Sequence, residues 1–286
     1  MHLSERGRAI FFMVLTSVLW SSSGLFIKLV TWNPFAISGV RSAIAALILW
    51  AYLRRPKMTW SFAQVGGAIA YAITVTLFVV ANKLTTAANV TLLQYTSPIF
   101  IAIFGTWFLK EKPNKYDWVT IFIVFIGMYF FFLDELSFDN LLGNILSILS
   151  GVGFAWVALF MRKQKDESPL ETAFLGNIFT FLINLPFMFG TPPDFNSILG
   201  LLFLGVFQLG FSYIFYAEAI KVITALESNL ISVIEPLLNP IWVFFVIGEV
   251  PGKWAAIGGI IVLVSVTVRY TIFDSPRFQK RLSAKT

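Results

Sequence analysis

Long apolar runs follow one another along the whole chain, and short polar segments separate them. A membrane-spanning α-helix needs about 20 apolar residues to cross about 30 Å of hydrocarbon, and most runs are about that long. Breaks such as Trp32-Asn33-Pro34 and Lys112-Pro113-Asn114 end the runs. The pattern predicts ten transmembrane helices, at residues 9–28, 35–53, 63–82, 86–109, 116–133, 141–161, 169–189, 198–219, 224–248 and 254–272.

Composition supports a membrane protein. Hydrophobic residues make up 57% of the chain, charged residues 13%, and the mean hydropathy is +0.79, all outside the soluble range. No connecting segment is long enough for a soluble domain, so we expect an all-α integral membrane protein. The chain has no Cys and its one His is His2. We therefore expect no catalytic residues, no metal and no cofactor, and hence no enzyme.

The formal charge of +6 comes from short basic clusters between the apolar runs. They form no stripe with aromatic residues, so we expect no nucleic-acid partner. Basic clusters such as 54–57, 110–115 and 162–165 fall on one side of the predicted membrane, and 134–139 on the other side is acidic. The positive-inside rule then places both termini in the cytoplasm of a protein of the inner (plasma) membrane. Arg6 and Arg8 precede the first run without a following cleavage site, so we expect a retained first span.

An internal repeat relates the two halves of the chain. Shifting the sequence by 138 positions lays residues 78–115 over 216–253, and matches Pro98 with Pro236 and Glu111 with Glu249. We divide the chain into residues 1–137 and 138–286, each with five predicted spans. Five is odd, so the second half must enter the bilayer from the opposite side.

Inverted repeats are the architecture of transporters that work by alternating access, with the substrate site near the midplane between the halves. We therefore expect a secondary transporter whose partners are a small-molecule substrate and the lipid bilayer. It is expected to work as a monomer, with a dimer as the alternative. A channel or a scaffold is the alternative class, but inverted repeats with polar breaks near the midplane favour a gated carrier.

Several motifs resemble the EamA branch of the drug/metabolite transporter superfamily. They are LWSSSGLFIK at 19–28, Arg41, KEKP at 110–113 and IEPLLNPIWVFFVIGEVP at 234–251. The resemblance covers nearly the whole chain, and implies ten helices in two inverted repeats around a cavity lined mainly by helices 1, 3, 4, 6, 8 and 9. Such carriers move amino acids, nucleotides, sugars and other metabolites. The small multidrug branch has an essential Glu in its first helix, whereas residues 9–28 contain no acid.

Glu235 is the residue that most needs a partner. It lies 11 residues after Thr224, about 16 Å into the bilayer and so near its midplane. An acid there costs at least about 2.5 kcal/mol, so it should face the protein interior or water. Three readings stay open: a packing residue, a proton carrier, or a partner for a cationic group of the cargo. Pro98 and Pro236 each remove a backbone hydrogen-bond donor and are expected to act as gating points.

Arg41 is a second buried charge, which either attracts an anionic group or caps helix carbonyls. The other candidate binding residues are polar or aromatic side chains inside the spans: Trp20, Tyr71, Gln94, Tyr95, Ser97, Trp156, Asn177, Tyr213, Ser232 and Asn239. With Glu235, they suit an amphipathic zwitterion, so we expect export or exchange of amino acids, aromatic ones included. A sugar-phosphate or nucleotide antiporter would need several cavity cations, and only Arg41 and Lys28 are available. A proton-coupled drug or cation exporter is the third alternative.

Overall fold

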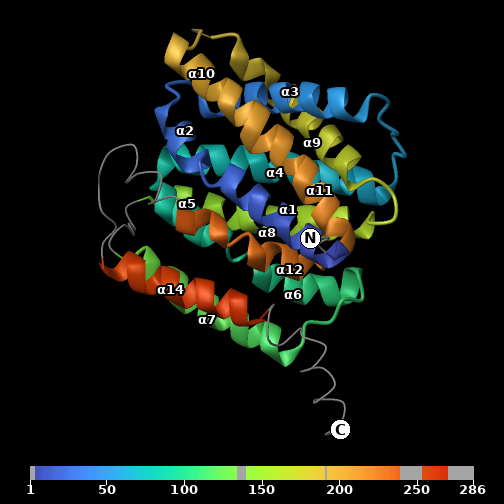
Figure 1. Cartoon of the computed structure of the whole chain (residues 1–286). Helices are drawn as coiled ribbons and strands as arrows, with labels where there is room; N and C mark the ends of the chain where they lie inside the picture. Colours follow the sequence, from blue (N-terminus) through green and yellow to red (C-terminus); the bar gives the residue numbers. More distant parts are fainter. Residues whose placement is uncertain (1–3, 134–139, 191, 239–252, 270–286) are drawn as a thin grey trace, which may run out of the picture.

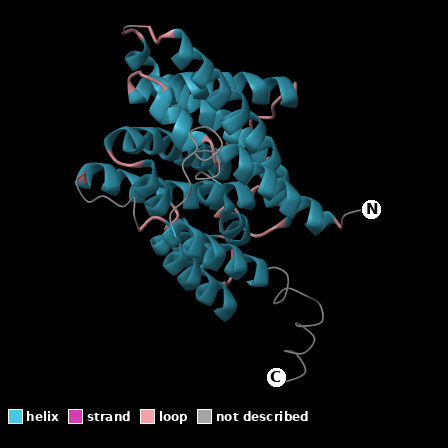
Figure 2. Cartoon of the chain, turned by 60° about the vertical axis from the view of Figure 1, so that its left-hand side comes forward, coloured by secondary structure: helices cyan, strands magenta, loops and turns pink. Residues whose placement is uncertain are grey.

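The computed structural model is a bundle of helices (Figure 1) and describes residues 4–133, 140–190, 192–238 and 253–269. Figure 2 shows no strand in these residues. The elements are α1 Glu5–Trp20, α2 Ser23–Leu29, α3 Pro34–Leu53, α4 Phe62–Leu84, α5 Ala87–Gln94, α6 Ser97–Phe108, α7 Lys115–Phe131, α8 Leu141–Lys163, α9 Pro169–Asn184, η1 Leu185–Met188, α10 Phe195–Phe203, η2 Leu204–Phe211, α11 Ser212–Val222, α12 Ala225–Ile231 and α14 Lys253–Val268.

Within the described residues, seven helical stretches are long and apolar enough to cross a membrane. They are Glu5–Leu29, Pro34–Leu53, Phe62–Leu84, Asn89–Phe108, Leu141–Lys163, Pro169–Met188 and Phe195–Val222. The shorter apolar helix α14 lies where the tenth span is expected. The all-α membrane class is therefore confirmed, whereas the count of ten inverted spans stays a prediction.

Three spans are broken near their middle. The fourth breaks at Tyr95 and Thr96 between α5 and α6, and the ninth breaks at Ser232 and Val233 after α12. Both breaks lie just before the prolines at 98 and 236, which confirms that these helices are interrupted at matching positions. The first span also breaks, between α1 and α2, at two serines and without a proline.

Helices from the two halves pack against one another at the centre of the bundle. α8 lies against α4 and α5, α1 lies against α11, and α3 lies against α9. α7 and α14 form a pair along one edge of the bundle (Figure 1). Glycines permit this contact: a Cβ on Gly151 of α8 would lie 2.7 Å from the carbonyl oxygen of Gln94.

Three ion pairs lie on the side of the bundle that carries the basic clusters. They are Arg6–Glu227 at 2.6 Å, Arg162–Glu111 at 2.7 Å and Arg269–Asp117 at 2.6 Å. Each pair joins residues 1–137 to residues 138–286. The side chain of Arg162 also donates to the carbonyls of Ile220 and Lys221 at the end of α11. Charged contacts therefore hold the two halves together on this side.

Two lysines cap each other's helices on the opposite side. Lys28 at the end of α2 donates to the carbonyl of Thr85, the C-cap of α4, at 2.7 Å. Lys83 at the end of α4 donates to the carbonyl of Val30, the C-cap of α2, at 2.6 Å. A cation is favourable at a helix C-terminus, where carbonyls lack helical partners. The two contacts fix α2 to α4.

The distribution of polarity is that of a protein surrounded by lipid. Large apolar side chains cover the outside of the bundle, among them Trp107 at 76%, Phe122 at 67% and Ile260 at 63% exposure. Polar side chains such as Thr16 and Ser42 are fully buried. A soluble monomer rarely exposes apolar patches of this extent. The described helices thus form a multi-pass membrane protein with a polar interior.

Candidate functional site

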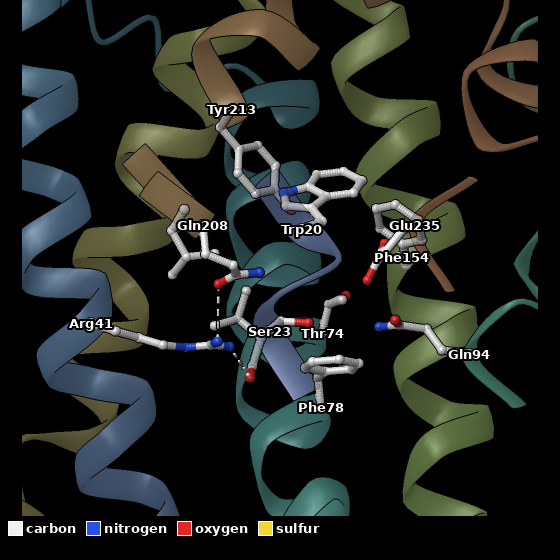
Figure 3. Close-up of a pocket in the computed structure, with 12 residues that line it drawn as sticks. Trp20, Ser23, Arg41, Thr74, Phe78, Gln94, Phe154, Gln208, Tyr213 and Glu235 are labelled. Atoms are coloured by element: carbon white, nitrogen blue, oxygen red, sulfur yellow. Dashed lines mark hydrogen bonds between the residues drawn. The ribbon is translucent and has the colours of Figure 1, made fainter. Parts of the chain in front are cut away.

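A small cavity lies at the centre of the bundle, among helices of both halves (Figure 3). Its volume is about 40 Å³, and its walls are Trp20, Ser23, Arg41, Thr74, Val75, Phe78, Gln94, Phe154, Gln208, Leu209, Tyr213 and Glu235. A buried water needs at least about 10–15 Å³, so in this conformation the cavity has room for a few waters at most. A metabolite-sized cargo requires the walls to move apart.

Glu235 lies directly after the break in the ninth span and reaches into this cavity (Figure 3). Its side chain is 8% exposed. Tyr95, at the break in the fourth span, lies with its hydroxyl 2.8 Å from the Glu235 carboxylate and 2.6 Å from the carbonyl of Ser232. Pro236 has no N–H to donate to the carbonyl of Ser232, which accepts instead from the N–H of Glu235 at 2.9 Å as well as from Tyr95. The two broken helices are thus joined through one tyrosine hydroxyl.

Arg41 enters the cavity from α3 and is only 1% exposed. Its Nη1 donates to Oε1 of Gln208 at 3.1 Å, and its Nη2 donates to the carbonyl of Val75 at 3.3 Å. Its Nε has no hydrogen-bond partner among the residues that the structure describes. The buried guanidinium is therefore only partly satisfied, although unpaired buried donors are costly.

Gln94 and Ser97 flank the break in the fourth span and both contact the second half. The amide of Gln94 donates to Ser150 of α8 at 2.8 Å. The hydroxyl of Ser97 donates to Oδ1 of Asn229 in α12 at 2.7 Å. Gln94 lines the cavity, whereas Ser97 is fully buried in the contact between α6 and α12.

Aromatic rings form one wall of the cavity. Trp20 donates from Nε1 to Ser212 at 2.9 Å, and its ring centroid lies 5.4 Å from that of Tyr213 and 5.5 Å from that of Phe154. Tyr71 lies behind this wall, with its ring 4.8 Å from Tyr213. Its hydroxyl accepts from the amide of Asn177 at 2.9 Å. Tyr71 and Asn177 therefore support the wall without lining the cavity.

One predicted residue lies away from this cavity. Trp156 packs against Phe104, Phe108 and Phe160 and lines a separate apolar groove on α4, α6 and α8. Asn239 lies outside the described residues. The structure thus gathers Trp20, Gln94, Tyr213, Glu235 and Arg41 around one cavity, with Tyr95, Tyr71, Asn177, Ser232 and Ser97 next to it.

Sequence reasoning missed three polar lining residues, Ser23, Thr74 and Gln208. A glutamine inside an apolar span is as costly as other unpaired polar groups, so Gln208 was detectable in principle. The direction in which its side chain points could not be predicted, because Gln208 lies in η2, a π-helical segment inside the eighth span. Such segments are rare and are frequent at functional sites. Among the described residues, no group of His, Cys, Asp and Glu is placed to hold a metal.

Comparisons with known proteins agree with this architecture. The model of the EamA-like transporter family matches residues 7–133 and 141–271. An uncharacterized transporter from Archaeoglobus fulgidus is 28% identical over 89% of this chain and 94% of its own, and one from Clostridium kluyveri is 24% identical over 91% and 92%. A solved crystal structure superimposes with a TM-score of 0.79 over 96% of this chain and 98% of its own. At 16% identity, that likeness shows the fold alone.

Proposed function

This chain belongs to the EamA-like transporter family, and on that premise we propose that it is a secondary carrier of small zwitterions, amino acids above all. The carrier exports or exchanges its cargo across the inner (plasma) membrane, with both termini in the cytoplasm. Aromatic amino acids are included, because Trp20, Tyr213 and Phe154 form one wall of the central cavity.

One observation carries this proposal: a buried carboxylate and a buried guanidinium line the same small cavity. Glu235 and Arg41 project into it from opposite sides, with Ser23 and Thr74 between them (Figure 3). An unpaired charge in a low-dielectric site is stabilised by an opposite charge on the ligand. A zwitterion supplies both charges at once, with its ammonium at Glu235 and its carboxylate at Arg41.

Alternating access is supported by the way in which the halves meet. The broken fourth and ninth spans face each other at the cavity, and Tyr95 connects them through Glu235 and Ser232. In the part of the chain that the structure describes, the three ion pairs between the halves lie on the basic side. Rocking of one half against the other would break these pairs and open the cavity to the cytoplasm, with Pro98 and Pro236 at the points that bend.

The alternative cargoes fit the cavity less well. A sugar phosphate or nucleotide carries at least two negative charges, but Arg41 is the only cation among the lining residues and Glu235 would repel the anion. A proton-coupled exporter of organic cations is the second candidate, because Glu235 alone would serve it. That reading leaves Arg41 without a role in the cavity.

Counterflow in proteoliposomes tests the proposal. Vesicles are loaded with a mixture of unlabelled amino acids, and trace labelled amino acids are added outside. We expect accumulation above that in empty liposomes, and its loss in Glu235→Gln. The matched control is Glu167→Gln, which alters an exposed acid in a loop and should leave counterflow unchanged. If no amino acid accumulates with the wild-type protein, the zwitterion proposal is wrong.

A further inference from the structure

The guanidinium of Arg41 is buried at a place where helix capping does not require it. The Val75 carbonyl that it contacts lies inside α4, which runs without a break from Phe62 to Leu84. A carbonyl inside a helix already accepts from the N–H four residues later. The contact therefore fixes the position of Arg41, but it does not satisfy a carbonyl that would otherwise lack a partner. Helix capping thus does not offset the free-energy cost of burying this charge.

The guanidinium of Arg41 still has N–H donors without a partner among the described residues. Arginine has five N–H donors in a rigid fork, and the bonds to Gln208 and Val75 use one from each Nη. Nε is buried without a partner in the described residues, although Arg41 lines the cavity. A guanidinium that offers Nε–H together with a neighbouring N–H is the usual partner of a planar carboxylate.

Gln208 completes this side of the cavity. Its Oε1 accepts from Arg41, so its Nε2 group faces away from the guanidinium (Figure 3). The π-helical segment η2 places this residue on the cavity wall, within an otherwise apolar span. Both side chains therefore present N–H donors to the same space, and no carboxylate among the described residues is bonded to either.

We propose that Arg41 and Gln208 form a carboxylate-binding subsite, through which the carrier selects α-amino acids over the amines left when the carboxylate is removed. The inference rests on the proposed function and adds its selectivity. The cargo carboxylate accepts from the remaining N–H groups of the Arg41 guanidinium and from the amide of Gln208. Its ammonium then lies toward Glu235 on the opposite wall, and its side chain lies along the aromatic wall.

Paired probes test the subsite. Counterflow is measured for phenylalanine against 2-phenylethylamine and for leucine against 3-methylbutylamine, which differ only by the carboxylate. We expect the wild-type protein to transport each amino acid at least about tenfold more efficiently than its amine, because a hydrogen bond to a charged group contributes about 1.5–3 kcal/mol. Arg41→Gln should remove this preference by slowing amino-acid transport and leaving amine transport as it was.

Two further variants separate recognition from folding. Gln208→Leu keeps the side-chain size and should raise the KM for phenylalanine without changing that for the amine. Arg41→Lys keeps the charge but loses the planar fork, and should retain part of the preference. The matched control Arg54→Gln changes an exposed arginine after α3 and should behave as wild type. Thermal unfolding of each purified variant confirms that it is folded.

The outcomes distinguish this inference from the function on which it rests. If amino acids and amines both accumulate and Arg41→Gln slows their transport equally or not at all, the proposed carboxylate subsite is wrong. The proposed function as a carrier is then still supported. If the wild-type protein accumulates neither member of any pair, the proposed function fails and the subsite fails with it.

Discussion

The hydroxyl of Tyr95 lies 2.8 Å from the carboxylate of Glu235, and this contact joins the break in the fourth span to the break in the ninth. The same hydroxyl lies 2.6 Å from the carbonyl of Ser232. It has one hydrogen for two acceptors. When Glu235 carries a proton, it can donate to Tyr95 while Tyr95 donates to Ser232, and both contacts are satisfied. A protonated Glu235 would therefore let the single hydroxyl of Tyr95 satisfy both contacts at this junction.

Removing this hydroxyl should impair transport without unfolding the protein. In Tyr95→Phe the packing of the ring is kept and both contacts are lost. We expect the initial rate of counterflow to fall by about tenfold, since hydrogen bonds to charged groups contribute about 1.5–3 kcal/mol. The control is Tyr129→Phe on the exposed face of α7, which should have the wild-type rate. An unchanged rate in Tyr95→Phe would show that the junction does not take part in transport.

A covalent bond between the halves on the basic side should stop transport reversibly. The chain has no native cysteine. We expect Arg6→Cys combined with Glu227→Cys to be crosslinked by a short bifunctional thiol reagent, because the native side chains meet at 2.6 Å. Counterflow should stop when the link forms and return when a cleavable linker is reduced.

The matched control for this link lies within one half. Glu218 and Lys221 pair at 2.7 Å along α11, so the same double substitution there forms a link that no rocking motion would strain. It should leave counterflow intact. Full transport with the Arg6 and Glu227 positions linked would mean that the halves do not separate on this side.

Arg162 should contribute more to stability than its ion-pair partner Glu111. Arg162→Met removes the ion pair and two contacts to the end of α11, and leaves Glu111 unpaired. Breaking such a pair costs on the order of 3 kcal/mol, so we expect an apparent Tm several degrees lower in detergent. Glu111→Gln should have a smaller effect, because Arg162 keeps the carbonyls of Ile220 and Lys221. The exposed Lys165→Met is the control, and equal shifts for Arg162→Met and Glu111→Gln would contradict this order.

Acid should weaken the hydrogen bonds that Asp194, the N-cap of α10, accepts from Thr31 and Ser197. Hydrogen bonds from the Thr31 hydroxyl, and then from the backbone and hydroxyl of Ser197, lower the pKa of Asp194 to about 2 from its ordinary 3.8. A lowered pKa in the folded state means that the stabilisation is complete above about pH 4 and is lost as the pH falls toward 2. Asp194→Asn should therefore have a lower Tm than wild type at pH 7.

The pH dependence provides the check on this assignment. The difference in Tm between wild type and Asp194→Asn should shrink between pH 4 and pH 2. Asp166→Asn, in the exposed loop after α8, should match wild type throughout. A difference that does not vary with pH would mean that the charge of Asp194 is not the cause.

Much of the fold could be predicted because a helix that crosses lipid must be apolar along its whole length, which leaves a clear pattern in the sequence. Each span is a long apolar run, and Pro98 and Pro236 mark interruptions, since proline removes a helical hydrogen bond wherever it occurs. The break at Ser21 and Ser22 could not be predicted in this way. Serine hydroxyls can bond back to helix carbonyls or point elsewhere, and only the packing of neighbours decides.

The candidate site was predicted best where burial is most costly. Glu235 and Arg41 were identified because a charge in a span must face the interior. Trp156 was not placed correctly by its residue type, since an aromatic ring is equally stable against lipid or against other rings. Gln208 was missed because its position on the cavity wall depends on the π-helical segment, and no periodicity in the sequence predicts that segment.

The break in the first span gives its two parts different neighbours. α1 packs against α11 and α12 of the second half, whereas α2 is fastened to α4 of the first half by the reciprocal contacts of Lys28 and Lys83. α2 also contacts the second half, where Phe26 stacks on Phe203 of α10 with ring centroids 4.2 Å apart. The part of the first span beyond the break therefore bridges the two halves. Under the proposed rocking, the break at Ser21 and Ser22 would let α1 and α2 tilt separately, which an unbroken helix could not do.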